Sequence, residues 1–234
     1  MSGWLELARG PFLYLAFAVL ILGALRQWTL AVGELARARE MAGDQKIPWR
    51  WMLKKSLGWI VPVNALRGTR IPFTLASVAF HAGMLAVPLF LAGHVALVEK
   101  GLGVGWPALP SAVADGLTLA ALAGLAVLLL YRLLDKAARF MSGPQDYLLL
   151  ALCVAVFLTG YFVAHPAGSP LPFTLMYLGH LLSAELVLVL IPFSKLCHAL
   201  LFASTRIVWE LGWHFVPGGG DRVREALGKA GEPV

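Results

Sequence analysis

Four of the six histidines in this chain fall within two apolar stretches of its sequence. His81 and His94 lie in one stretch, and His180 and His198 lie eighteen residues apart in the other. Polar side chains are costly to place in hydrocarbon, so histidines inside apolar segments indicate a function. The chemistry that suits two histidines is axial ligation of a haem iron, because two imidazoles on facing helices can hold a flat porphyrin between them.

The segments that carry these histidines are apolar enough to cross a membrane. Of the 234 residues, 59% are hydrophobic and 14% are charged, and the mean hydropathy is +0.76, outside the range typical of a soluble domain. Runs of about 20 apolar residues can span a bilayer as helices, which satisfy their own backbone hydrogen bonds. The sequence therefore predicts an all-α bundle of five transmembrane helices, over residues 11–32, 73–98, 112–134, 147–165 and 173–204.

Lysine and arginine predict the orientation of the bundle. They are concentrated between the first and second spans, between the third and fourth, and after the fifth, which places those segments in the cytoplasm and the N-terminus outside. The net charge of +6 is then explained by topology and by an acidic lipid surface, without nucleic acid. The basic residues of the first loop are Arg37, Arg39, Lys46, Arg50, Lys54, Lys55, Arg67 and Arg70.

The predicted domain organisation follows from the spans. Residues 1–204 form the membrane domain, which includes a basic cytoplasmic loop at 33–72, and residues 205–234 form a cytoplasmic tail. Within the loop, "WRWMLKKSLGWIV" mixes tryptophans with cations, which is typical of an amphipathic segment that lies on a lipid surface or docks a partner. We expect the protein in the inner membrane of a prokaryote, as a multi-pass protein.

The direction of each span pairs the histidines by depth. The second span runs outward and the fifth runs inward, so His81 lies level with His198 and His94 level with His180. Eighteen residues make about five turns and roughly 27 Å of a straight helix, so both histidines of the fifth span leave it on one face. Two pairs at two depths predict two haems stacked across the membrane. A zinc or copper site would need three or four ligands at one depth.

The thirteen-residue spacing of the second span needs a distortion of its helix. At about 100° per residue, His94 points about 140° away from His81 on a straight helix. Pro88 lies between them and predicts a kink or bulge that re-aims one ring. The small residues beside the histidines, which would let a porphyrin approach or would pack helices together, are Gly83, Gly93, Gly179 and Ala184.

Several stretches resemble one known family. "PFSKLCH", whose histidine follows another by eighteen residues, resembles the fifth span of the respiratory nitrate reductase gamma subunit family, a dihaem membrane cytochrome b. "FHAGMLAVPLFLAGH" is similar to the second span of that family, and "ILGALRQW" and the basic turn before "DYLLLALC" are similar as well. The resemblance covers nearly the whole chain and includes relatives from sulfur metabolism and from heterodisulfide-reductase-like complexes.

The resemblance implies cofactors, partners and an activity. It implies two b-type haems, the inner one ligated by His81 and His198 and the outer one by His94 and His180. It further implies a quinone or quinol substrate, either menaquinol or ubiquinol, near the outer haem, and electron exchange with a cytoplasmic iron-sulfur subunit. The chain would be the quinol-oxidising or quinone-reducing subunit of an oxidoreductase whose terminal substrate is handled by a further catalytic subunit.

Other polar residues are weaker candidates. Lys100 and His165 lie near the outer ends of spans and Glu185 lies inside the fifth span, so these three are candidates for a quinol site or a proton path. Arg26 and Arg132 lie near inner ends, where arginine either reaches the headgroups or binds haem propionates.

Two alternatives remain open at the level of the sequence. A proton-coupled small transporter without haem would use Glu185 and the histidines as a proton path, although the chain shows no internal repeat. A purely structural anchor would leave the paired histidines unexplained.

Overall fold

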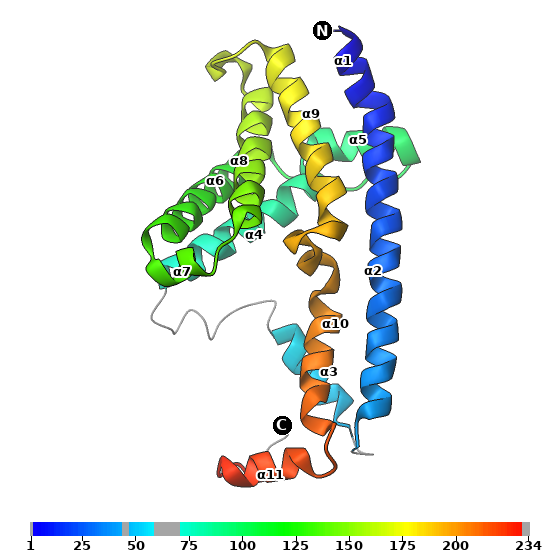
Figure 1. Cartoon of the computed structure of the whole chain (residues 1–234). Helices are drawn as coiled ribbons and strands as arrows, with labels where there is room; N and C mark the ends of the chain where they lie inside the picture. Colours follow the sequence, from blue (N-terminus) through cyan, green and yellow to red (C-terminus); the bar gives the residue numbers. More distant parts are fainter. Residues whose placement is uncertain (1, 44–46, 59–70, 231–234) are drawn as a thin grey trace. The chain divides into compact units, whose positions relative to one another are not determined.

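The protein is helical throughout the residues that its structure describes. The computed structural model (Figure 1) describes residues 2–43, 47–58 and 71–230, and no strand occurs within them. Parts of the basic loop, including Lys46, Trp59, Arg67 and Arg70, lie outside the described residues. The chain forms two compact units, residues 1–14 with 64–187 and residues 15–63 with 188–234.

Five helices in the described residues are long and apolar enough to cross a membrane, so the chain is a multi-pass membrane protein. These candidate spans are Gly3–Met41, Ile71–Phe90, Ser111–Leu134, Pro144–Ala164 and Phe173–Phe193. The third and fourth agree closely with the predicted ranges. The first is longer than predicted, because α1 (Ser2–Leu7) continues through a π-helical turn at Ala8–Phe12 into α2 (Leu13–Met41).

The first unit is built around close contact between α4 (Ile71–Phe90) and α6 (Ser111–Leu134). Glycine makes this contact possible: a Cβ atom on Gly124 would lie 2.5 Å from the carbonyl oxygen of Ala76, and one on Gly83 would lie 2.7 Å from that of Leu117. Gly83, which we considered as a point of porphyrin access, therefore packs against α6. The buried core of the unit consists of Val87, Ala121, Leu125, Cys153 and Phe157.

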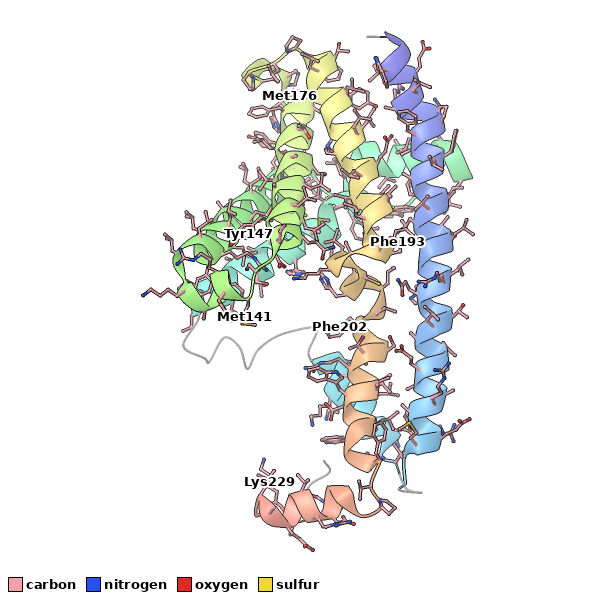
Figure 2. All side chains as sticks on the ribbon, in the orientation of Figure 1. Met141, Tyr147, Met176, Phe193, Phe202 and Lys229 are labelled. Atoms are coloured by element: carbon pink, nitrogen blue, oxygen red, sulfur yellow. The ribbon has the colours of Figure 1, made fainter. Side chains whose placement is uncertain are left out.

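A polar turn connects α6 to α8 (Pro144–Ala164) through the short helix α7 (Lys136–Phe140). Arg132 donates to the Ser142 hydroxyl at 2.8 Å and pairs with the Asp146 carboxylate at 3.7 Å. The same carboxylate accepts the Gly143 amide proton at 2.9 Å, which caps α8. Met141 and Tyr147 mark this end of the helix pair in Figure 2.

The second predicted span is not one helix, which corrects the range 73–98. Helix α4 ends at Phe90, Leu91 is extended with φ −67° and ψ 132°, and α5 begins anew at Ala92 and ends at Leu102. In Figure 1, α5 leaves the direction of α4. Pro88 cannot donate a backbone hydrogen bond and favours such a distortion, so the distortion expected from the histidine spacing is present as a break.

The fifth predicted span, 173–204, is also interrupted. Helix α9 ends at Leu190, a 3-10 turn follows at Ile191–Phe193, and Ser194 is extended before a second turn at Lys195–Cys197. Helix α10 then runs from His198 to Leu211. The prediction that His180 and His198 share one straight helix face was therefore wrong, because Pro192 and Ser194 end the α-helical repeat between them.

The second unit joins the rest of α2 to α3 (Trp49–Gly58), α10 and α11 (Gly219–Ala226). Ala38, Met52 and Leu211 form its buried cluster, and Lys55 forms an ion pair with Glu210 at 3.0 Å. Gln27 donates its side-chain amide to the Pro192 carbonyl oxygen at 2.6 Å. Part of the basic loop thus forms a helix, α3, with Met52 buried and Leu53 exposed, and its contact with lipid or a partner stays a prediction.

Replacing Gly124 with alanine should destabilise the first unit. The added Cβ would lie against the Ala76 carbonyl oxygen, and overpacking of this kind costs about 1–3 kcal/mol. Unfolding of the detergent-solubilised protein, followed by thermal or denaturant titration, would measure the loss. Gly116→Ala on the same helix is the matched control, because its Cβ meets no described atom within 4 Å. Equal stability of the two variants would contradict the close contact.

Candidate site at the paired histidines

The structure brings His94 and His180 together in the first unit. Their rings come from α5 and α9, lie parallel with an interplanar angle of 3°, and have centroids 6.1 Å apart. Both side chains are partly buried. This is the pair expected at the outer depth.

Hydrogen bonds define which nitrogen of each ring carries the proton. His94 Nδ1 lies 3.3 Å from the Val87 carbonyl oxygen, and His180 Nδ1 lies 3.1 Å from that of Val156. A carbonyl oxygen only accepts, so Nδ1 is the protonated nitrogen in both rings. The lone pair for a metal then lies on Nε2, and a backbone carbonyl bonded to the other nitrogen is the usual support for a metal-binding histidine.

The break between α4 and α5 creates the His94 half of this pair. Residues 87 and 94 would lie about 10 Å apart along a continuous helix. In the structure the His94 ring reaches the Val87 carbonyl oxygen seven residues back, because the chain turns at Leu91. The thirteen-residue spacing from His81 is thus accommodated by a break in the helix.

Gly160 on α8 provides the space for the His180 ring. A Cβ atom at Gly160 would lie 2.9 Å from Cε1 and 3.0 Å from Nδ1 of His180, closer than real contacts allow. Sequence reasoning missed this residue, because it considered only glycines beside a histidine on the same helix.

His81 and His198 show the same backbone support. His81 Nδ1 donates to the Ser77 carbonyl oxygen at 2.7 Å, and His198 Nδ1 donates to that of Lys195 at 2.6 Å. His81 belongs to the first unit and His198 to the second, and both side chains are exposed. Their pairing at an inner haem stays a prediction.

His165 is paired with a carboxylate that the sequence did not single out. Its Nε2 lies 3.3 Å from Asp115 Oδ2, its Nδ1 donates to the Tyr161 carbonyl oxygen at 3.0 Å, and its ring stacks on Tyr161 at 4.3 Å. Asp115 stands near the start of α6, and His165 follows the end of α8. The pair is an ionisable group at the end of the unit where α9 begins.

The other candidates lie in different surroundings. Glu185 is buried with an exposed fraction of 6%, and its Oε1 has no hydrogen-bond partner among the described residues. Lys100 is exposed near the end of α5, and Arg26 is exposed on α2 in the second unit. Arg132 is engaged by Ser142 and Asp146 in the polar turn, which gives it a structural role there.

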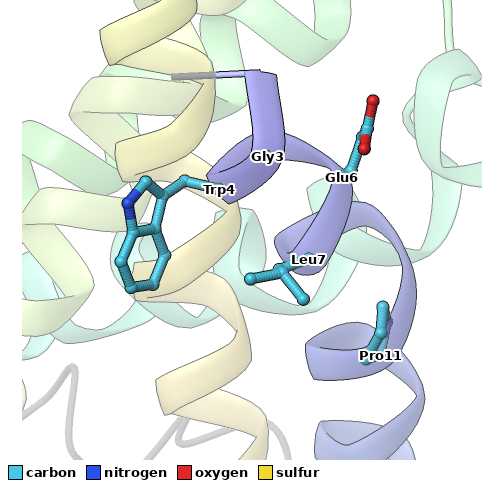
Figure 3. Close-up of a pocket in the computed structure, with 5 residues that line it drawn as sticks. All are labelled: Gly3, Trp4, Glu6, Leu7 and Pro11. Atoms are coloured by element: carbon cyan, nitrogen blue, oxygen red, sulfur yellow. The ribbon is translucent and has the colours of Figure 1, made fainter.

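An open pocket near the N-terminus does not add a site. Its lining residues, shown in Figure 3, all belong to α1 and the following turn: Gly3, Trp4, Glu6, Leu7 and Pro11. Trp4 and Glu6 point in different directions, so no polar groups converge on a ligand.

The donor set at this pair suits a haem. Within the described residues, no three side chains of histidine, cysteine, aspartate or glutamate come together as a metal cluster would require. A haem brings four ring nitrogens of its own and asks the protein for two axial ligands. Two parallel imidazoles, each with Nδ1 bound to a backbone carbonyl, are ligands of the kind that a haem uses.

Comparison with known proteins identifies one relative. A protein of Nitratidesulfovibrio vulgaris strain Hildenborough is 35% identical over 171 residues, which are 73% of this chain and 74% of the relative. No family model matches the chain, and no solved structure matches it. The identity and the shared coverage place the two chains in one family.

Replacing Gly160 with alanine should displace the His180 ring. The new Cβ would lie only 2.9 Å from Cε1 and 3.0 Å from Nδ1, so we expect the ring to move and its hydrogen bond to Val156 to break. Nitrogen-15 NMR of histidine-labelled protein would report this as a shift of the His180 Nδ1–H signal. Gly179→Ala is the control, since its Cβ would only touch Thr159 Cγ2 at 3.6 Å. An unchanged His180 signal in the Gly160→Ala variant would refute this account.

Proposed function

We propose that this chain, which belongs to one family with the Nitratidesulfovibrio vulgaris protein, is the membrane cytochrome b subunit of a respiratory quinol oxidoreductase complex. The observation that carries the proposal is the His94–His180 pair, with parallel rings and both Nδ1 protons bound to backbone carbonyls. The resemblance to the nitrate reductase gamma subunit family adds a second haem at His81 and His198.

The residues of the chain define how the site would work. A b-type haem held between His94 and His180 would accept and pass on single electrons. Val87 and Val156 hold the two rings by their Nδ1 protons, which keeps each Nε2 lone pair available. Gly160 leaves room for one ring, and the extended Leu91 re-aims the other.

A quinol substrate would exchange protons at the same end of the first unit. His165 with Asp115 is the best placed candidate, because the imidazole is partly exposed and its Nε2 lies 3.3 Å from a carboxylate oxygen. Lys100 and Glu185 remain candidates for the same path. Electrons would leave toward a cytoplasmic iron-sulfur subunit, and the terminal substrate would be handled by a further subunit.

The topology that we propose places the N-terminus outside and the C-terminus in the cytoplasm, in the inner membrane of a prokaryote. The cations of α3, of the turn near Arg132 and of the tail support it through the positive-inside rule. The His94–His180 pair then lies toward the outer face.

Reporter fusions should confirm this topology. Alkaline phosphatase, which needs an oxidising compartment, should be active at the N-terminus and inactive at the C-terminus, and green fluorescent protein should show the reverse pattern. A fluorescent N-terminal fusion together with an active phosphatase at the C-terminus would overturn the proposed orientation and the position of the quinol site.

The purified protein should contain two b-type haems per chain. Difference spectra, dithionite-reduced minus oxidised, together with the haem-to-protein ratio would measure this. His94→Ala and His180→Ala should each lose the same haem, and the double variant should lose no more than either single one. His81→Ala and His198→Ala should lose the other haem.

His165→Ala is the control for these variants, because it removes an imidazole from the same unit without touching the pair. It should keep both haems. A protein made with haem available that shows no difference spectrum would contradict the cytochrome and leave the histidines to a proton-coupled transporter.

A further inference from the structure

The break after α4 removes the helical donors of three backbone carbonyl oxygens, those of Pro88, Leu89 and Phe90, and the last two receive new donors from a distant loop. In a continuous helix the carbonyl oxygen of Leu89 would accept the Gly93 amide, and that of Phe90 would accept the His94 amide. In the structure the His94 amide donates to the Leu91 carbonyl oxygen instead, at 2.9 Å. A carbonyl left without a donor in a water-free environment costs several kcal/mol, so these two groups need other partners.

The loop between α5 and α6 supplies both partners. The Trp106 indole N–H donates to the Leu89 carbonyl oxygen at 2.8 Å, and the Leu109 amide donates to the Phe90 carbonyl oxygen at 2.8 Å. Gly103 adopts a left-handed conformation, with φ 71°, and turns the chain back toward the break. Pro107 and Pro110 restrict the loop on either side of Leu109. Residues 103–110 therefore cap the end of α4.

The capping competes with a continuous helix. If the loop donors were absent, Leu89 and Phe90 would regain hydrogen bonds only by pairing with the amides of Gly93 and His94. That change would straighten the span and take the His94 ring away from the Val87 carbonyl oxygen, because residues 87 and 94 lie about 10 Å apart along a continuous helix. The ring would also leave its position parallel to His180.

We propose that Trp106, assisted by Leu109, is a positioning residue for His94. It does not touch the imidazole and acts by holding the α4–α5 break open, so that α5 presents His94 to His180. The expected effect on the haem rests on the proposed function. The expected effect on the position of His94 rests on the hydrogen bonds alone. It predicts that the loop tunes the potential and occupancy of the haem at this pair.

The test compares two tryptophans that each donate to a backbone carbonyl. Trp106→Phe keeps the ring and removes the N–H, and Trp28→Phe does the same in the second unit, where the Trp28 indole donates to Leu200 at 3.2 Å. We expect Trp106→Phe to weaken haem binding at the His94–His180 pair roughly 3- to 10-fold, as the loss of one hydrogen bond would. Trp28→Phe should leave that pair unchanged.

Two spectroscopic readings accompany the binding measurement. Electron paramagnetic resonance of the ferric haem depends on the angle between the two imidazole planes, so its signal should move away from the parallel form in Trp106→Phe. The midpoint potential of the same haem should shift, while that of the haem at His81 and His198 stays constant. Leu109→Pro, which deletes the second donor, should act in the same direction if Trp106→Phe does not fold.

A measurement that does not need haem tests the role of Trp106 independently of the proposed function. Spin labels at Leu102→Cys on α5 and Phe140→Cys on α7 report the direction of α5 within the first unit, in a background with Cys153→Ala and Cys197→Ala. Both labelled positions are well exposed, at 77% and 92%. The distance between the labels should change or broaden in Trp106→Phe and remain constant in Trp28→Phe.

The outcomes separate the two ideas. A wild-type protein without haem would end the proposed function, and the spin-label distances would still decide the role of Trp106. A wild-type protein with two haems whose signal, potential and label distances are unchanged in both Trp106→Phe and Leu109→Pro would overturn the role of Trp106 alone.

Discussion

The rest of this structure depends on one constraint. Backbone carbonyl groups that lose their hydrogen-bond donors where a helix is interrupted need new donors. A span that crosses hydrocarbon cannot leave such groups to water, so every interruption has to bring its own donors. The α4–α5 break recruits Trp106 and Leu109, and the turn after α9 recruits Gln27 to the carbonyl of Pro192. Loops and side chains distant in sequence thereby become part of the helix ends.

The same constraint orients the imidazoles. Each of the four histidines from the apolar stretches donates Nδ1–H to a backbone carbonyl, at Ser77, Val87, Val156 and Lys195. In His94 and His180, the bond to the carbonyl commits Nδ1 to the fold, and Nε2 is the nitrogen that could bind a metal. Folding and ligand geometry are therefore coupled, because the bond that satisfies the backbone also selects the nitrogen that can bind a metal.

The sequence predicted what depends on composition and spacing, and missed what depends on contacts between distant segments. Long apolar runs suffice to predict five spans, and Pro88 suffices to predict a distortion. Neither Pro88 nor the spacing could show that the helix stops at Phe90, because the loop that stabilises this stop comes 13 or more residues later in the chain. The range 173–204 was wrong for a similar reason, since hydropathy does not register the extended Ser194.

The residues of the candidate site also include some that the sequence predicted and others that it missed. The pairing of His94 with His180 follows from depth, which spacing can supply, whereas Gly160 and Asp115 act across helices and have no signal in their own neighbourhoods. Such cross-helix partners become visible only when α8 is placed beside its neighbours.

The break in the second span is itself an argument about function. A continuous helix would satisfy the Leu89 and Phe90 carbonyls without ordering residues 103–110. A helix that served only to anchor the chain would therefore gain nothing from replacing these two helical hydrogen bonds with donors from a loop. The exchange replaces helical hydrogen bonds with donors from the loop and requires additional order there. What it gains is the placement of one imidazole parallel to another at 6.1 Å, with Val87 as its support. Under the proposed function, the distortion is explained by the position that it gives to His94 beside His180.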